Sequence, residues 1–223
     1  MWNLCWQLRS DGEMTSKRIY LSGAEKRKRR KLKIHAHRTK DAARVRVTVF
    51  YEALCPDSRN FIVHQLYPVW QDLGNIMNLD LHAFGKARET DAGGFTCQHG
   101  EKECEANLML TCAQSVVRDP QALMKFIHCV MQRYEGVDGG LLCANDSGVD
   151  YSEVRECMSS GAGVRLQHDI GEKQAQLNPR LTYVPWILLN NVFTAKTLSL
   201  AQDDLRRVVC NAYRGPTPEA CEE

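Results

Sequence analysis

The cysteine content constrains this chain more than any other feature. It has 10 cysteines in 223 residues, and proteins of reducing compartments rarely carry so many unless the thiols bind metal. Zinc sites normally show pairs of ligands about two to four residues apart, whereas the two closest cysteines, Cys97 and Cys104, have six residues between them. We therefore expect disulfide bonds and an oxidising compartment.

His99 is a candidate metal ligand near these cysteines. It lies two residues after Cys97, but one such pair without a second pair is not a zinc pattern. A histidine in this place more often makes a hydrogen bond that positions its loop, and we expect that role for His99. We predict no metal and no other cofactor.

Charge divides the chain near residue 43. Residues 1–43 contain 12 Lys and Arg against 4 Asp and Glu, a net charge of +8, whereas residues 44–223 contain 17 against 23, or −6. Residues 26–33 read KRKRRKLK, and such self-repulsion without apolar anchors predicts a disordered arm. A nuclear-import or nucleic-acid-binding segment is the alternative. No aromatic side chain interrupts the basic run, so we do not expect nucleic acid as a partner.

Membrane insertion and a secretory leader are both unexpected. The best apolar run, residues 184–189, stops at Asn190 and Asn191, well short of the roughly 18 residues of a spanning helix. A leader would need a basic start followed by an apolar run, and residues 1–60 show none. This second expectation conflicts with the oxidising compartment that the cysteines indicate.

The first regular elements surround a cysteine. Apolar residues recur at every second position from Val45 to Tyr51, which is the period of a β strand. Pro56 has a fixed φ and no N–H, so it suits the first turn of a helix, which we expect to reach Trp70. A second strand over residues 78–84 completes a βαβ unit with parallel strands.

A helical block and a second strand region follow. The periodicity predicts helices over residues 101–117, 120–134, 152–158 and 164–177, with a loop over 136–148. Asp119 is the expected N-cap before Pro120. A strand over residues 183–189 then turns at two asparagines into a strand over 192–197, and Ser199 begins a capping box for a last helix.

Cys55 lies between the first strand and the first helix. Unpaired amides and the dipole at a helix N-terminus stabilise a thiolate, so Cys55 is a candidate nucleophile. The alternative is half of a disulfide, and Cys5 in the arm is a possible partner. Without these two, an even number remains, enough for four disulfides whose connectivity stays open. These disulfide candidates are Cys97, Cys104, Cys112, Cys129, Cys143, Cys157, Cys210 and Cys221. Cys104 and Cys112 lie about 12 Å apart along one predicted helix, too far to bridge each other.

Val184-Pro185 opens the third predicted strand. A proline at the start of a buried strand cannot donate to the sheet, so an edge position or a cis turn explains it. A simple strand-opening proline is the alternative. Thioredoxin-fold proteins place the cis-proline that faces the nucleophilic cysteine at this point of the chain, after the helical block.

A longer motif carries a family resemblance. Residues 97–112 match all eight specified positions of C-Q-H-G-x2-E-C-x2-N-x4-C, so the chain resembles the gamma-interferon-inducible lysosomal thiol reductases over residues 44–221. The resemblance implies an α/β, thioredoxin-like βαβ–ββα fold over residues 44–214, with a disulfide-stapled helical insertion over about 90–180. Residues 1–43 are then an arm and 215–223 a tail. It also implies reduction of disulfides in unfolding protein substrates, in a lysosomal or extracellular location.

One departure from the family pattern bears on the mechanism. The family motif is C-x-x-C, whereas this chain reads Cys55-Pro56-Asp57-Ser58. Ser58 cannot resolve a mixed disulfide, so release would need glutathione, cysteine or another thiol. We expect Cys55 to attack, the Ser58 hydroxyl to donate to its thiolate, and Val184 and Pro185 to present backbone to the substrate.

The departure also leaves an alternative of a different class. A non-catalytic, chaperone-like binding module would keep the groove without turnover. In either case Asn145, in the tripeptide Asn145-Asp146-Ser147, is a glycosylation acceptor that we place in a loop.

Overall fold

The computed structural model describes residues 5–8, 14–17, 22–27 and 42–222. The chain divides into two units, residues 1–42 and residues 43–223. This division agrees with the boundary that the charge pattern places near residue 43.

The first unit contains regular structure in its described segments. Strand β1 (Cys5–Leu8) pairs antiparallel with β2 (Met14–Lys17). Residues 23–27 form one helical segment, and Ser22 and Glu25 cap it reciprocally, each backbone N–H donating to the other side chain. Residues 28–33 of the basic run lie outside the described residues, and the disorder of residues 1–43 stays a prediction.

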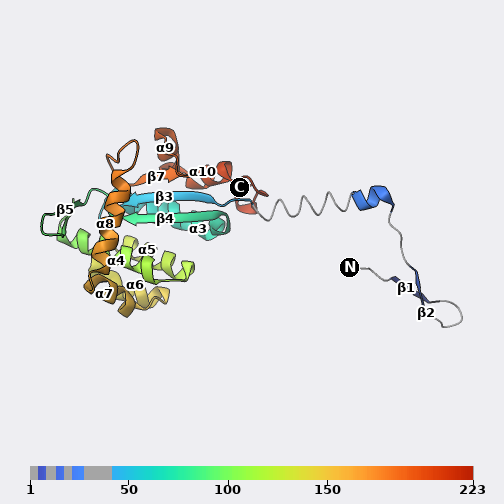
Figure 1. Cartoon of the computed structure of the whole chain (residues 1–223), viewed down its shortest axis with the longest axis horizontal. Helices are drawn as coiled ribbons and strands as arrows, with labels where there is room; N and C mark the ends of the chain where they lie inside the picture. The colour runs from blue at the N-terminus through green and yellow to red at the C-terminus, as the bar shows by residue number, and fades with distance from the viewer. Residues whose placement is uncertain (1–4, 9–13, 18–21, 28–41, 223) are drawn as a thin grey trace. The chain divides into compact units, whose positions relative to one another are not determined.

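A three-stranded sheet organises the second unit (Figure 1), in the order β4-β3-β7. Strand β3 (Val45–Tyr51) pairs parallel with β4 (Met77–Ala83) and antiparallel with β7 (Trp186–Leu189). The predicted parallel βαβ pair is confirmed. Because β3 is central, its side chains are buried on both faces, as its apolar sequence requires.

A continuous helical run connects β3 to β4. It starts as α2 (Pro56–Phe61) with Pro56 in the first turn, widens into the π-helical segment η1 (Ile62–Leu66), and continues as α3 (Tyr67–Leu73) and the 3-10 turn η2 (Gly74–Ile76). The widening coincides with Pro68, which has no N–H for an α-helical bond and whose ring would clash with the preceding turn.

The insertion between β4 and β7 is mostly helical. It begins with the small hairpin β5 (Arg88–Glu89) and β6 (Phe95–Thr96). The helices that follow are α4 (Glu101–Val116), α5 (Pro120–Arg133), α6 (Gly140–Ser147) after the 3-10 turn η3 (Gly136–Gly139), α7 (Tyr151–Ser159) and α8 (Ala162–Ala175). Asp119 caps α5 as predicted, its side chain accepting from the Gln121 N–H.

The prediction of a loop over residues 136–148 is wrong, because this segment forms η3 and α6. Cys143 and Ala144 are fully buried there, and the Cys129–Cys143 disulfide holds α6 against α5. Gly148 then ends the helix with a φ of 78°. Asn145 therefore lies exposed on a helix and not in a loop.

The second strand of the predicted C-terminal hairpin is also wrong. Asn190 and Asn191 turn the chain with φ values of 51° and 64°, but Val192 makes only an isolated bridge to Leu189. The side chain of Thr194 accepts from the Thr197 N–H and starts α9 (Ala195–Asp203). Ser199 thus lies inside α9, so its predicted capping box does not form. Asp204 caps the last α-helix, α10 (Leu205–Ala212), and the 3-10 turn η4 (Glu219–Cys221) follows.

Four disulfides join the eight candidate cysteines. Their pairs are Cys97–Cys104, Cys112–Cys157, Cys129–Cys143 and Cys210–Cys221. The second joins α4 to α7 and the last ties the tail to α10. Among the described residues, no helix is both long enough and apolar enough to cross a bilayer.

Candidate active site

Cys55 is the N-cap residue of α2, directly after β3. Its sulfur accepts from the Ser58 N–H at 3.5 Å, and its carbonyl oxygen accepts from the Arg59 N–H at 2.9 Å. The side chain is 7% exposed, and within residues 42–222 Cys55 is the one cysteine that is not in a disulfide. A sulfur in this position faces the unpaired amides of a helix N-terminus, which stabilise negative charge.

The Val184-Pro185 bond is cis, and it faces Cys55. The Cys55 sulfur lies 3.9 Å from the Val184 carbonyl oxygen. Pairing of Phe50 with Trp186 brings the start of β7 beside the end of β3, and this register joins two sites 129 residues apart. The structure thus brings together Cys55, Ser58, Val184 and Pro185.

Ser58 contributes backbone rather than side chain to the cysteine. It is fully buried, and its hydroxyl oxygen accepts from the Glu52 N–H at 3.3 Å. The contact with the sulfur comes from the Ser58 N–H. Accepting from the Glu52 N–H leaves the hydroxyl proton able to donate, so the expected hydroxyl–thiolate bond stays a prediction.

Tyr134 borders the site, although no sequence pattern indicated it. It ends α5 in the left-handed conformation, with a φ of 59°, and its hydroxyl donates to the Leu54 carbonyl oxygen. The Arg59 guanidinium lies 5.7 Å from the centre of its ring. Burial raises the pKa of Tyr134, and the nearby Cys55 and Glu103 raise it further. The phenol therefore stays protonated and keeps donating to the loop.

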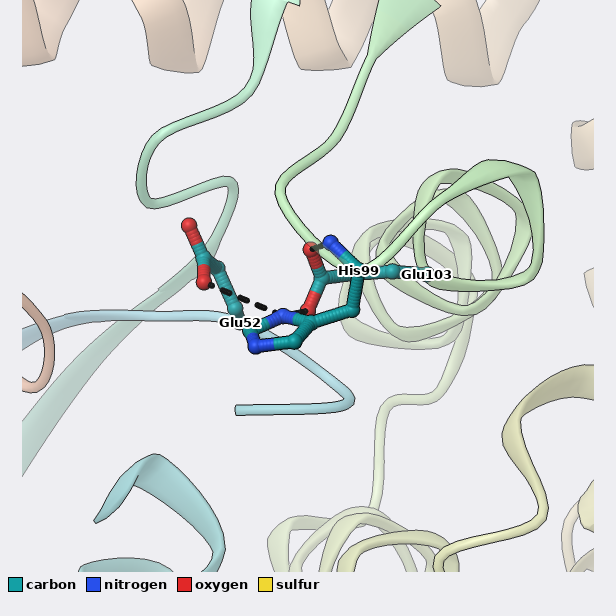
Figure 2. A group of neighbouring side chains, drawn as sticks. All are labelled: Glu52, His99 and Glu103. Carbon is teal, nitrogen blue, oxygen red and sulfur yellow. Dashed lines mark hydrogen bonds and ion pairs between the residues drawn. The ribbon is translucent and has the colours of Figure 1, made fainter. Parts of the chain in front are cut away.

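The loop before Cys55 contacts a cluster of three side chains through the Leu54 N–H. Figure 2 shows the members of this cluster, Glu52, His99 and Glu103. Both carboxylates are fully buried. The Nδ1 atom of His99 lies 2.6 Å from Glu103 Oε2 and 3.7 Å from Glu52 Oε2. Burial, followed by the charge of Glu103, raises the pKa of Glu52, against the opposing effect of a hydrogen bond from the Lys86 N–H.

This cluster has the residue types of a metal site but the spacing of a hydrogen bond. One possible metal-ligand atom from each side chain lies within 4.8 Å of the other two. Ligands of a tetrahedral zinc ion, each bonded at about 2.0 to 2.1 Å, lie about 3.3 Å apart, whereas His99 Nδ1 and Glu103 Oε2 are separated by 2.6 Å. The geometry is that of a histidine hydrogen-bonded to a carboxylate.

The sequence predicted some of these residues and missed others. His99 makes the kind of positioning hydrogen bond that we expected, with its backbone N–H also donating to Glu103 Oε1 at 3.0 Å. Glu52 carried no prediction, although an acidic residue at the end of a buried strand beside a cysteine was a usable signal. Asn145 lies on α6, outside this group.

Comparison with known proteins places this geometry in a family. The model of the family described as "Gamma interferon inducible lysosomal thiol reductase (GILT)" matches residues 46–147. The Carassius auratus gamma-interferon-inducible lysosomal thiol reductase is 35% identical over 186 residues, which cover 81% of this chain and 73% of that protein. The Mus musculus protein of the same name is 33% identical over 183 residues, with coverages of 79% and 71%.

Solved structures support the fold at low identity. BdbD from Bacillus subtilis superposes with a TM-score of 0.52 at 15% identity, covering 73% of this chain and 90% of that chain. DsbA from Chlamydia trachomatis gives a TM-score of 0.50 at 15% identity, covering 74% and 87%. The predicted thioredoxin-like α/β fold with a disulfide-stapled helical insertion is confirmed.

Proposed function

The chain belongs to the gamma-interferon-inducible lysosomal thiol reductase family, and from this membership we propose that Cys55 is its nucleophile for thiol–disulfide exchange on protein disulfides. One observation carries the proposal. The Cys55 sulfur lies at a helix N-terminus and 3.9 Å from the carbonyl oxygen before a cis-proline. This places the sulfur at a helix N-terminus, beside the backbone of Val184 and Pro185 with which a substrate chain would pair.

The reaction has two exchange steps. The Cys55 thiolate attacks one sulfur of a substrate disulfide, so that a mixed disulfide forms and the other substrate sulfur leaves as a thiolate, which takes up a proton. A small thiol such as glutathione or cysteine then attacks the Cys55 sulfur and releases the reduced substrate. A second small thiol regenerates Cys55 and leaves as the small-molecule disulfide. Two external thiols therefore supply the electrons that a resolving cysteine at position 58 would otherwise relay.

The substrate is an unfolded or extended chain in this proposal. Val184 and Pro185 present backbone to it beside the sulfur. Two tyrosines near this backbone are partly exposed, Tyr183 at 45% and Tyr134 at 40%, and they offer aromatic surface to apolar side chains. We place the protein in a lysosomal or extracellular compartment, with Asn145 as its glycosylation acceptor.

A binding module without turnover is the second candidate, and Ser58 is the observation that favours it. The residue has no thiol, and its hydroxyl is bound to the Glu52 backbone. Such a protein would hold unfolded chains at the same backbone of Val184 and Pro185 and would accumulate no covalent intermediate.

Trapping the mixed disulfide separates the two candidates. The full chain is incubated with a disulfide-bonded, denatured protein and a limiting amount of cysteine, then quenched with acid and examined by mass spectrometry. We expect a covalent adduct at Cys55, release of substrate thiols as cysteine is raised, and loss of both in Cys55→Ser. Ser199→Ala, a change at an exposed position on α9, is the matched control and should behave as the parent. Turnover without an adduct at Cys55, or equal behaviour of Cys55→Ser, would contradict the catalytic proposal.

A further inference from the structure

The loop that presents Cys55 is held by side chains from α4. The Ala53 N–H donates to Asn107 Oδ1 at 2.9 Å, and the Leu54 N–H donates to Glu103 Oε2 at 3.2 Å. We propose that Glu103 and Asn107 are positioning residues for the exchange reaction, and that Glu103 also sets the charge beside the cysteine. The inference rests on the proposed role of Cys55 and adds to it a function for the long motif.

Burial makes these two contacts hard to replace. Glu103 and Asn107 are both fully buried, so water cannot take over as the acceptor if either side chain is removed. A buried N–H that is left without a partner destabilises the folded state by the full desolvation penalty of that group. The loop would then move so that its N–H groups find new partners. Cys55 would be displaced with it, because Cys55 comes directly after Leu54.

Glu103 is itself oriented from two sides (Figure 2). His99 donates to Oε1 through its backbone N–H and contacts Oε2 through Nδ1, at 3.0 and 2.6 Å. Glu52 faces the same histidine ring, and its Oε2 atom is buried without a hydrogen bond. The carboxylate of Glu103 thus has one arrangement in which it satisfies both the loop and His99.

The helix that presents these residues is rigidly placed. Glu103 and Asn107 are four positions apart, so they lie on the same face of α4. Disulfides fix the helix near both ends, through Cys104 and Cys112. Gln167 of α8 also donates to the Asn107 carbonyl oxygen at 3.2 Å. Side chains on an anchored helix hold a loop more accurately than side chains on another loop.

The motif therefore has two kinds of position. Its cysteines anchor α4, while His99, Glu103 and Asn107 reach from that end of the insertion to the loop before Cys55. Asn107 joins both parts, because its Nδ2 atom also lies 4.0 Å from the Cys97 sulfur.

Charge is the second contribution of Glu103. Its Oε2 atom accepts from the N–H of Leu54, the residue directly before Cys55, and the charges of both Cys55 and Glu103 act on Tyr134. A negative carboxylate opposes the formation of a thiolate nearby. The other ionisable groups in contact with this neighbourhood are Glu52, Lys86, His99, Arg59 and Tyr134.

The test separates position from charge with three variants of the full chain. Glu103→Gln removes the charge, keeps an oxygen that accepts from the Leu54 N–H, and loses the acceptor for the His99 N–H. Asn107→Ala removes the acceptor for Ala53 and leaves the charge. Glu103→Ala removes both. The rate of Cys55 reaction with dipyridyl disulfide, read from the released thiopyridone, is measured from pH 4 to 9 together with the thermal midpoint.

We expect each variant to change a different part of the pH profile. Glu103→Gln should move the midpoint of the profile toward acid, because it removes a negative charge near the sulfur. Asn107→Ala should lower the limiting rate about tenfold without that movement, because the thiolate is misplaced. Glu103→Ala should show both effects, and Glu103→Gln should react several-fold faster than it. The control is Glu89→Gln, at a carboxylate that pairs with a surface histidine, His168, at 2.9 Å, and it should match the parent.

Three results would overturn the inference. One is an unchanged profile in both Glu103→Gln and Asn107→Ala, even with lower thermal midpoints, because these residues would then be purely structural. Another is the combination of two rates of Cys55 reaction: Glu103→Gln reacts no faster than Glu103→Ala, and Asn107→Ala reacts as fast as the parent. A third is the same shift in Glu89→Gln. If Glu103→Ala does not fold, the other two variants still decide the matter. A parent chain without reaction at Cys55 would instead refute the proposed function.

Discussion

Ser58 shows at the scale of one residue what the C-x-x-S motif changes. Its backbone N–H lies 3.5 Å from the Cys55 sulfur, which is the approach that an N-cap residue and the third residue after it make at the start of a helix. Its side chain points instead to the Glu52 N–H. The resolving position is thus close to the nucleophile but carries an oxygen that serves the backbone.

Replacing this serine by cysteine should restore a resolving thiol. Ser58→Cys is expected to raise substrate turnover at low glutathione and to make it less dependent on added thiol, because the second sulfur can attack the mixed disulfide. The measurement is the rate of disulfide reduction against glutathione concentration. Cys55→Ser should abolish activity in either background.

Ser58→Ala is the matched control for this substitution. Both changes weaken the bond from the Glu52 N–H, so both should lower stability by about 1 kcal/mol, and only the cysteine should raise turnover. Equal rates for the parent, Ser58→Cys and Ser58→Ala at every thiol concentration would refute resolution at this position.

Asp80 gives the protein a pH dependence away from the active site. Its carboxylate contacts His82 and Lys173, each at 3.0 Å, and the hydrogen bond from His82 is the largest of the causes that lower its pKa. The pKa of an aspartate in an unfolded chain is about 3.9. The contribution to folding stability is therefore present above that pH and is lost as the pH falls through the lower pKa of the folded state.

Asp80→Asn should therefore destabilise the chain in a pH-dependent way. We expect a lower thermal midpoint than the parent at pH 6, and a difference that narrows below about pH 4 as Asp80 of the unfolded parent chain takes up a proton. Thermal unfolding followed across this range is the measurement. Asp138→Asn removes a surface carboxylate that pairs with Lys102 and should leave the midpoint nearly unchanged. A constant difference at every pH would contradict the assignment.

At the scale of elements, the insertion helices depend on their disulfides. The Cys112–Cys157 bond links α4 to α7 across 45 residues, and both sulfurs are buried. Because Gly163 has no side chain, α8 approaches this bond closely, and a Cβ at that position would lie 2.7 Å from the Cys112 sulfur. The bond is therefore part of the packing that keeps α4 in place behind the active site.

Removing this disulfide should cost more stability than removing the one in the tail. The chain-entropy model gives about 4 kcal/mol for Cys112–Cys157 and about 3 kcal/mol for Cys210–Cys221, which closes a shorter loop, with a separation of 11 residues. Urea unfolding of the two double alanine variants is the measurement. The first variant should also slow the reaction of Cys55, because α4 holds its loop. A larger loss from the tail variant would contradict this role.

At the scale of the whole molecule, a basic arm and an acidic body share one chain. Residues 1–42 and 43–223 form separate units, and the opposite net charges fall on either side of nearly the same boundary. The core of the second unit includes residues from β3, the insertion and α10, so this unit buries its own apolar surface.

A chain shortened to begin at Ala42 should therefore fold as the parent does. We expect an unchanged thermal midpoint and one free thiol in the unreduced shortened chain, because its other eight cysteines are in disulfides. Calorimetry and thiol counting are the measurements. A fall of several degrees in the midpoint would show that the arm supports the body. Three or more free thiols would contradict the four disulfides.

The sequence alone determined the features that local chemistry dictates. A strand that ends at a cysteine and is followed by proline predicts a thiol at a helix N-terminus, since each of those preferences acts over a few residues. The eight-position motif identified the family, and the even number of remaining cysteines indicated four disulfides. Asp119 was identified as an N-cap because a capping side chain bonds within its own turn.

Only the tertiary structure decided what depends on partners distant in sequence. Val192 makes only one isolated bridge, to Leu189, and Thr194 caps the start of α9. Residues 192–197 therefore do not form the strand that their β pattern predicted. The α6 segment is helical where its glycines and polar residues suggested a loop, because Cys143 is bonded to α5. The same reason applies to the site: Glu103, Asn107 and Tyr134 reach the loop before Cys55 from 49, 54 and 80 residues away. Local preferences carry no information about such contacts, because burial and packing against the rest of the fold create them.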